Sequence, residues 1–272
     1  MNITTASFHI IKHCNTSCKF CYATFTDLIP SSQLNLVECI TILNKLYKAG
    51  IKKITFAGGE PMLFKNLDLV IVIAKEIGFT TSIITNGSFL THDFLIKMQQ
   101  HLDWIGISVD SLDNRTNLKT GRLSKVKDHL DYYQMIYMIK QFKYKIKINT
   151  VVNRYNQDES LQSFINYVNP QRWKIFDTLR VDGQNHKQFD EIKSTKYNQF
   201  IDRHSHPNMV VENNKLMTGS YLLIDSQGRL FENSKGKHSY SNSLLTNTFD
   251  ECYKQINVNE EMFIKRGGEY EW

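Results

Sequence analysis

Three cysteines lie within eight residues near the start of the chain, at Cys14, Cys18 and Cys21. Three thiolates can hold three irons of a [4Fe–4S] cluster, and the fourth iron then stays open to another ligand. A structural zinc ion normally takes four protein ligands, so zinc would have to recruit His9 or His13. The odd total of five cysteines argues against a disulfide framework and for metal ligation in a reducing compartment. We therefore expect a cluster with one open coordination position.

A second motif, Phe56-Ala57-Gly58-Gly59-Glu60-Pro61, comes at the end of a predicted strand. Two adjacent glycines let the backbone approach a ligand closely, and a carboxylate can pair with an ammonium group. Taken alone, Gly58 and Gly59 predict only a turn.

Short β-branched runs alternate with longer stretches of helical periodicity, which predicts a repeated βα unit. The predicted strands are Phe8 to Ile11, Lys53 to Phe56, Thr81 to Thr85, Trp104 to Ser108, Ile146 to Val152 and Trp173 to Leu179. The predicted helices are Leu36 to Tyr47, Leu67 to Ile77, Asp93 to His101, Ser124 to Phe142 and Asp158 to Val168. Because βα crossovers are right-handed, the strands form a parallel sheet. The fold class is α/β, a partial (βα)6 barrel over residues 1–182 with its chemistry at the carboxyl ends of the strands.

After residue 182 the pattern changes, and we expect residues 183–272 to form a C-terminal extension that closes over the substrate site. One helix is predicted around Thr195 to His204. A hairpin is predicted from Tyr221 to Ile224 and Arg229 to Phe231, across a turn at Ser226-Gln227-Gly228.

The composition narrows the class of protein. A chain of 272 residues with 41% hydrophobic content can bury a sizeable core. No apolar run approaches the roughly 20 residues that span a bilayer. The net charge of +6 is spread along the chain, which argues against a nucleic-acid surface and leaves either general solubility or an anionic small molecule. We expect a cytoplasmic monomer that binds neither membrane nor nucleic acid.

The cysteine segment fits the pattern CxxxCxΦC, in which Φ is the aromatic Phe20. On this signature the chain resembles the radical S-adenosylmethionine (SAM) superfamily. The resemblance implies that the cluster cleaves SAM into methionine and a 5′-deoxyadenosyl radical, that the Gly-Gly-Glu motif meets the methionine amino group, and that two strand residues hold the ribose. The residues so assigned to the cofactor are Phe20, Gly58, Gly59, Glu60, Ser108 and Asn149. Ser108 and Asn149 are also consistent with ordinary polar positions in a strand.

Further stretches along nearly the whole chain are similar to the antiviral viperin family, and most of all to its prokaryotic branch. They are Thr85 to Ser88, Ile107 to Ser111, Lys147 to Arg154, Asn169 to Lys174, Ser220 to Asp225 and Phe263 to Tyr270. The resemblance implies a lyase that acts on a ribonucleoside triphosphate. The radical takes the ribose 4′ hydrogen, the 3′ hydroxyl leaves as water, and one electron from an external one-electron reductant plus one proton complete a 3′-deoxy-3′,4′-didehydro nucleotide.

A triphosphate needs convergent cations, and burying an unpaired charge is costly. Positions that match family residues at the substrate are Ser7, Lys53, Arg122, Lys147, Arg172, Lys174, Tyr221, Arg266 and Gly267. Lys147 and Lys174 are the sharpest predictions, because a basic residue on a barrel strand points either into the barrel or at a helix. Tyr221 is the candidate catalytic residue, excluding water and relaying the proton, or else it packs the hairpin.

This sequence also departs from the family. Vertebrate members carry an amphipathic membrane-anchoring helix before the core, whereas here the first strand begins within eight residues, so no membrane attachment is expected. Ser7 replaces an asparagine associated with the base, which leaves CTP and UTP both open. One alternative is a radical SAM enzyme that acts on another small molecule or a peptide. The other is a metal-binding regulator that holds zinc through the cysteines and a histidine.

Overall fold

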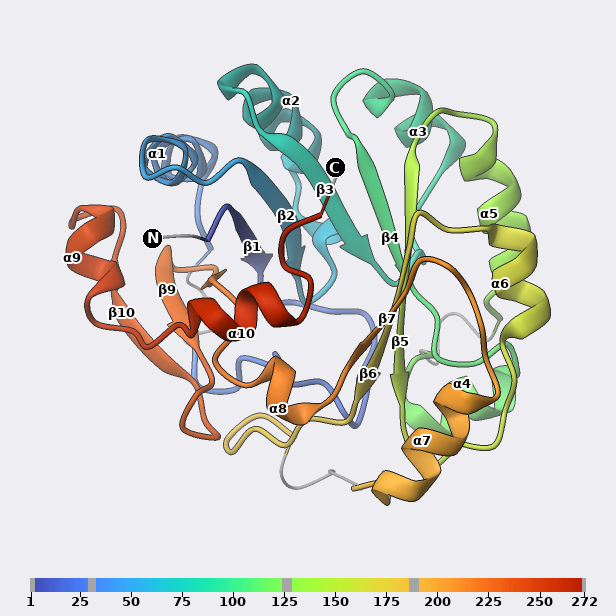
Figure 1. The fold of residues 1–272 in the computed structure, drawn as a ribbon. Coiled ribbons are helices and arrows are strands. Elements are labelled where there is room, and N and C mark those ends of the chain that lie inside the picture. The colour runs from blue at the N-terminus through green and yellow to red at the C-terminus, as the bar shows by residue number, and fades with distance from the viewer. Residues whose placement is uncertain (1–2, 29–32, 124–128, 186–190, 271–272) are drawn as a thin grey trace.

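The computed structural model describes residues 3–28, 33–123, 129–185 and 191–270. The strands form one sheet in the order β10-β9-β8-β1-β2-β3-β4-β5-β6-β7. The six predicted strands are β1 (Thr5–Ile11), β2 (Lys53–Gly58), β3 (Thr80–Thr85), β4 (Trp104–Ser108), β5 (Lys145–Val152) and β6 (Arg172–Asp177). Each pairs in parallel with the next, which confirms the parallel α/β sheet. The sheet curves, and the helices between its strands lie on the outside (Figure 1).

The outer helices are α1 (Leu36–Lys48), α2 (Leu67–Ile77), α3 (His92–Met98), α5 (Tyr132–Lys140) and α6 (Gln162–Val168). Asn35 begins α1 through a capping box with Glu38, in which each side chain accepts the other residue's backbone N–H. The buried face of α1 includes Cys39, which is far from the other cysteines in sequence and fully enclosed by the core. These helices therefore cover the outer face of the sheet with apolar side chains.

Two predicted helices are shorter than the sequence suggested. The helix predicted from Ser124 begins only at Tyr132, because Asp131 caps its first turn by accepting the N–H of Gln134 at 2.9 Å. Residues 124–128 of that prediction lie outside the described residues. The helix predicted from Asp158 begins at Gln162, since the chain before it forms a turn in which Gln157 donates to the Asn153 carbonyl. A further helix, α4 (Asn114–Thr120), was not predicted.

The chain after β6 adds strands to both edges of the sheet. After α7 (Ser194–Asp202), which confirms the helix predicted there, β7 (Met209–Glu212) pairs in parallel with β6. The predicted hairpin is present as β8 (Leu223–Ile224) and β9 (Arg229–Glu232), and β10 (Ser239–Ser243) follows. β8 pairs in parallel with β1, so the hairpin extends the sheet rather than forming a separate layer.

A 3₁₀ turn at Pro61–Leu63 lies between β2 and α2. Near the C-terminus are three short helices, α8 (Asn214–Met217), α9 (Phe249–Tyr253) and α10 (Glu260–Lys265). After α10 the chain runs back across the sheet toward β3 (Figure 1). Across the described ranges, every helix is too short or too polar to cross a bilayer.

The alternation of side chains along each strand decides what faces the inside of the curved sheet. On β5, Lys147, Asn149 and Val151 all line an internal cavity, and on β6 Lys174 and Phe176 do so. The residues between them, such as Ile148 and Ile175, are fully buried in the core. The polar members of the strands are thus directed inward.

Candidate active site

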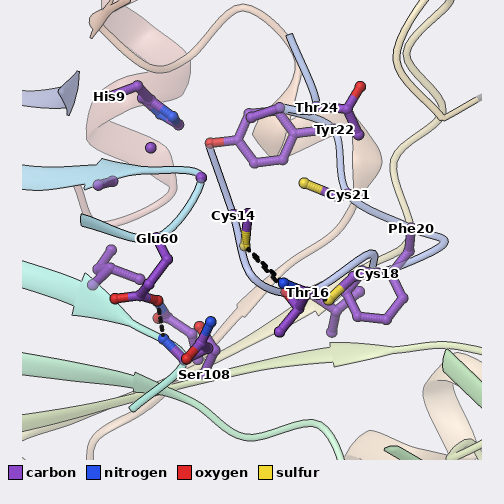
Figure 2. Close-up of a pocket in the computed structure, with 18 of the residues that line it drawn as sticks. His9, Cys14, Thr16, Cys18, Phe20, Cys21, Tyr22, Thr24, Glu60 and Ser108 are labelled. Atoms are coloured by element: carbon purple, nitrogen blue, oxygen red, sulfur yellow. Dashed lines mark hydrogen bonds between the residues drawn. The ribbon is translucent and has the colours of Figure 1, made fainter. Parts of the chain in front are cut away.

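The sheet encloses a cavity of about 700 Å³. It brings together residues from the loop after β1, the six parallel strands β1 to β6 and the C-terminal hairpin. Figure 2 shows the part of it around the three cysteines, Glu60 and Ser108. The predicted site residues that line it are Ser7, Cys14, Cys18, Phe20, Cys21, Gly58, Gly59, Glu60, Ser108, Arg122, Lys147, Asn149, Lys174 and Tyr221. Four other predicted residues, Lys53, Arg172, Arg266 and Gly267, do not line it.

The three cysteines share the loop after β1, and their thiols are free and half-buried. The Thr16 hydroxyl lies between two of them, 3.2 Å from Cys14 Sγ and 3.7 Å from Cys18 Sγ (Figure 2). Within the described residues, no three His, Cys, Asp or Glu side chains approach closely enough to hold one metal ion. Thiols that face one space but do not converge on a point fit separate irons of a cluster better than a single zinc ion.

The unpredicted helix α4 supports this loop. Ser17 donates its backbone N–H to the Gly121 carbonyl at 3.0 Å, and Lys19 donates to the Thr120 carbonyl at 2.9 Å. Gly121 ends α4 with a φ of +82°, and a Cβ there would lie 2.2 Å from the Ser17 carbonyl oxygen. Only glycine therefore allows the end of α4 to meet the cysteine loop.

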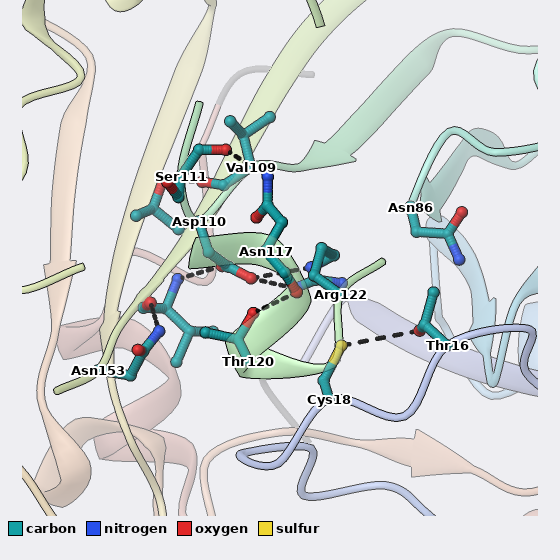
Figure 3. Close-up of polar contacts among 12 residues, drawn as sticks. Thr16, Cys18, Asn86, Val109, Asp110, Ser111, Asn117, Thr120, Arg122 and Asn153 are labelled. Carbon is teal, nitrogen blue, oxygen red and sulfur yellow. Dashed lines mark hydrogen bonds and ion pairs between the residues drawn. The ribbon is translucent and has the colours of Figure 1, made fainter. Parts of the chain in front are cut away.

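Arg122 follows directly and lies beside Cys18 (Figure 3). Its Nε donates to Asp110 Oδ2 at 2.9 Å, its terminal nitrogen contacts the same oxygen, and Asp110 Oδ1 accepts the N–H of Val151. Burial raises the pKa of the Cys18 thiol, and the charge of Arg122 opposes that shift. The sequence grouped Arg122 with the phosphate-binding cations, whereas the structure fixes it at the cysteine end of the cavity because its buried partner is there.

The Gly-Gly-Glu motif lies against the cysteine loop. A Cβ on Gly58 would lie 2.3 Å from the Ile11 carbonyl oxygen, and one on Gly59 would lie 2.1 Å from that of His13. The glycines thus permit a close approach of two chain segments. The Glu60 carboxylate is buried and accepts the Thr85 hydroxyl at 2.5 Å and the Asn86 N–H at 2.8 Å.

Ser108 and Asn149 are neighbours in register on β4 and β5, and both line the cavity. Asn149 Oδ1 is buried and has no hydrogen-bond partner among the described residues. An unsatisfied amide oxygen inside a cavity is costly unless a ligand donates to it. With the three thiols, it makes the cavity a good fit for a [4Fe–4S] cluster and SAM.

At the far end of the cavity from the cysteines lie two lysines. Burial lowers the pKa of Lys147 to about 7, with a contribution from Arg172. Burial also lowers the pKa of Lys174 well below its ordinary value. Lysines whose charge is disfavoured by burial gain most from an anionic ligand. This cationic floor, Lys147 with Lys174, is the part of the cavity suited to phosphates.

Behind the floor the remaining predicted cations are packed against aromatic rings. Lys53 Nζ donates to Tyr270 Oη at 2.6 Å and lies 4.2 Å from the Trp104 ring centre. Arg172 stacks 3.9 Å from the Tyr270 ring and donates to the Gly267 carbonyl at 2.5 Å. Lys53, Arg172 and Gly267, which the sequence places at the substrate, thus contact one another or Tyr270 in the C-terminal segment and do not line the cavity.

Tyr221 lines the cavity beside the floor. Lys174 Nζ donates to its hydroxyl at 3.0 Å, and the Arg266 guanidinium stacks 3.5 Å from its ring. Its own hydroxyl donates to Glu212, a fully buried acid at the end of β7 that also pairs with Lys174. Sequence analysis missed Glu212; the only signal was one acid closing the short apolar run Met209–Glu212.

Known proteins are similar to this chain along nearly its whole length. Residues 8–168 match the Radical SAM superfamily. The chain is 42% identical, over 99% of its length and 59% of the relative's, to an S-adenosylmethionine-dependent nucleotide dehydratase of Lacinutrix mariniflava. It is 38% identical to one of Flammeovirga pacifica, over 99% of this chain and 96% of that one.

An S-adenosylmethionine-dependent nucleotide dehydratase RSAD2 of the fish Siniperca chuatsi is 33% identical, over 100% of this chain and 80% of the relative. Among solved structures, Streptococcus suis SuiB bound to S-adenosylmethionine superposes with a TM-score of 0.71 at 15% identity, over 97% of this chain and 67% of that one. That likeness confirms the fold alone.

Fold and cysteine loop together define a radical SAM protein. Within that superfamily, the chain belongs to the family of S-adenosylmethionine-dependent nucleotide dehydratases, which confirms the resemblance to viperin.

Proposed function

We propose that this protein is a radical SAM dehydratase that converts a ribonucleoside triphosphate to its 3′-deoxy-3′,4′-didehydro analogue. The observation that carries the proposal is the cavity itself, which has three free thiols at one end and two lysines, the buried Lys174 and the half-buried Lys147, at the other. Cys14, Cys18 and Cys21 would hold a [4Fe–4S] cluster, which when bound would supply the 5′-deoxyadenosyl radical from SAM. The net change in the substrate is loss of the 4′ hydrogen to that radical and of the 3′ hydroxyl as water, completed by one electron and one proton.

The protein's own residues bind and orient the two ligands. Asn149 Oδ1 and Ser108 offer hydrogen bonds for the SAM ribose, and Glu60 for its ammonium group. Lys147 and Lys174 attract the triphosphate, which orients the nucleotide with its ribose toward the thiols. Tyr221 narrows the cavity beside the ribose and is the candidate for relaying the proton, since its hydroxyl contacts Lys174.

The decisive experiment incubates the cluster-reconstituted, reduced protein with SAM and each of the four ribonucleoside triphosphates separately. We expect 5′-deoxyadenosine to form strongly with one or two of them, together with a nucleotide lighter by one water. Equal 5′-deoxyadenosine with all four, and no lighter nucleotide, would refute the assignment.

Ser7 is the residue that bears on the choice of nucleobase. Ser7 lines the cavity next to Thr55 in register and offers one hydroxyl to a base, which favours a pyrimidine, CTP or UTP.

We propose that a separate one-electron donor reduces the cluster and that the enzyme is a cytoplasmic monomer with no nucleic-acid partner. Residues 183–272 would close the site, and the didehydro product would terminate viral polymerisation.

A further inference from the structure

One acidic side chain lies among the cations of the substrate end. Glu212 is fully buried, and its carboxylate pairs with Lys174 and accepts the Tyr221 hydroxyl. Arg266 Nη1 lies 4.0 Å from the same carboxylate. Glu212 does not line the cavity, so it lies behind the residues that do.

A carboxylate at this place is unexpected on electrostatic grounds, because it repels the phosphates that the site is built to attract. The carboxylate must therefore offset a larger free-energy cost, that of burying several positive charges together. Four cations, Lys147, Arg172, Lys174 and Arg266, crowd this end of the barrel, and burial disfavours the charged form of each lysine.

Each partner of Glu212 comes from a different element: Lys174 from β6, Tyr221 from the segment before β8, and Arg266 from the end of α10. Arg266 also donates its Nε to the Ser220 carbonyl at 3.1 Å, next to Tyr221, whereas Lys174 meets the other two only through side chains. The carboxylate is their shared contact, and it fixes the Lys174 ammonium and the Tyr221 hydroxyl against each other at 3.0 Å.

We propose that Glu212 is a positioning residue of the nucleotide site, an internal counter-ion that holds Lys174, Tyr221 and Arg266 in place and keeps Lys174 charged until the triphosphate arrives. The inference rests on the proposed function for the identity of the anion. Glu212 is the last residue of β7, so this strand would serve to place the counter-ion behind the cationic floor.

The charge relations make the proposal testable by pH. Glu212 raises the pKa of Lys174 against the effects of burial and of Lys147, Arg266 and Arg172. Replacing Glu212 with glutamine keeps its size but removes this support, so Lys174 loses its proton at lower pH. At about pH 8 we expect E212Q to bind the triphosphate about tenfold more weakly than the wild type, and at about pH 6 by a smaller factor.

The experiment measures dissociation constants of UTP, CTP and inorganic tripolyphosphate for the cluster-reconstituted protein at both pH values. Wild type, E212Q, K174M and the double variant K174M/E212Q are compared. In K174M the carboxylate has lost its main partner and repels the anion, so adding E212Q should strengthen binding about fivefold. The same substitution thus has opposite signs in the two backgrounds.

Asp225→Asn is the matched control, because Asp225 is also a fully buried acid paired with an arginine, Arg229, but it does not line or adjoin the cavity lysines. We expect this variant to lower thermal stability without changing the pH dependence of binding. Cluster absorbance, measured for every variant, shows that the fold around the cysteines is intact.

Equal weakening by E212Q at both pH values, or additive effects of K174M and E212Q, would show a purely structural role and overturn the inference. The proposed function fails separately: if the wild type binds tripolyphosphate but converts no nucleotide, the counter-ion test still gives its answer with tripolyphosphate. If the wild type binds no triphosphate at all, both proposals are wrong.

Discussion

The two ends of the cavity are built in different ways. At the cysteine end, the chemical groups come from a single loop, residues 14–21, and neighbouring segments only support it. At the other end, Lys147, Lys174 and Tyr221 come from β5, β6 and the segment before β8, more than seventy residues apart at the extremes. The radical-generating end can therefore be recognised from local spacing, whereas the substrate end exists only after the strands have paired.

The electrostatics of the two ends also differ. Burial raises the pKa of Cys21 to about 12, so its thiolate is strongly disfavoured until a metal binds. At the floor, burial instead disfavours the positive charge of the lysines. Burial thus disfavours the anionic form of the thiols at one end and the cationic form of the lysines at the other.

The largest expected effect comes from the cysteine end. Cys18→Ala should abolish the cluster, and with it all 5′-deoxyadenosine formation with or without nucleotide, because three thiolates are the minimum for the irons. Absorbance near roughly 400 nm and iron content check this. Cys39→Ala, which removes a thiol buried in α1, is the control and should keep the cluster while losing about 1 kcal/mol of stability. A cluster that persists in C18A would contradict the assignment of the loop.

Gly59→Ala tests whether the neighbouring segment is needed to shape the cysteine loop. A Cβ there would lie 2.1 Å from the His13 carbonyl oxygen, so the loop must move. We expect cluster content to fall by more than about half and stability by about 3 kcal/mol, both measured on the reconstituted protein. Gly50→Ala, with no atom within 4 Å of the added Cβ, should cost only about 1 kcal/mol and leave the cluster unchanged. Equal effects of both would show that the close approach is unimportant.

Lys174→Ala should disrupt the substrate end of the cavity and leave the cysteine end intact. It should weaken triphosphate binding about 100-fold, since it removes a cation and leaves Glu212 without its main partner. The cluster should remain, as should slow SAM cleavage without nucleotide. The control is Lys75→Ala on α2, which removes a half-exposed ion pair with Asp103 and should leave the triphosphate affinity unchanged. Loss of the cluster in K174A would mean that the two ends are not separable.

The smallest expected effect is a dependence of binding on pH. Because the pKa of Lys147 is lowered to about 7, nucleotide affinity should fall about tenfold as pH rises from about 6 to 8. Lys147→Arg, which stays charged, should flatten the profile. Isothermal titration across pH checks this, and an unchanged slope in K147R would assign the titration elsewhere.

Stability without substrate should respond in the opposite direction. Between about pH 7 and 10.5 the folded protein holds fewer protons at Lys147 than the unfolded chain does, so its stability rises with pH across that window. Thermal unfolding of wild type and Lys147→Met measures the difference.

Several elements show why sequence analysis succeeded or failed. The six parallel strands were predictable because each is a β-branched run, and the hairpin because its turn residues are distinctive. Helix α4 has the sequence Asn-Arg-Thr-Asn-Leu-Lys-Thr, which has no apolar periodicity, and it is held by contacts with the cysteine loop. Strand β7 has only four residues, and its pairing with β6 depends on the sheet edge being there.

By itself, the sequence determined the cysteine loop, the Gly-Gly-Glu motif and the βα order, because all three depend on spacing along a short stretch of chain. Tertiary structure alone decided which charges meet. It paired Arg122 with Asp110 at the cysteine end, placed Lys53 and Arg172 behind the cavity, and brought Glu212 to Lys174. The physical reason is that a buried charge needs a partner, and the partner can come from a distant part of the chain, as Glu212 of β7 does for Lys174 of β6.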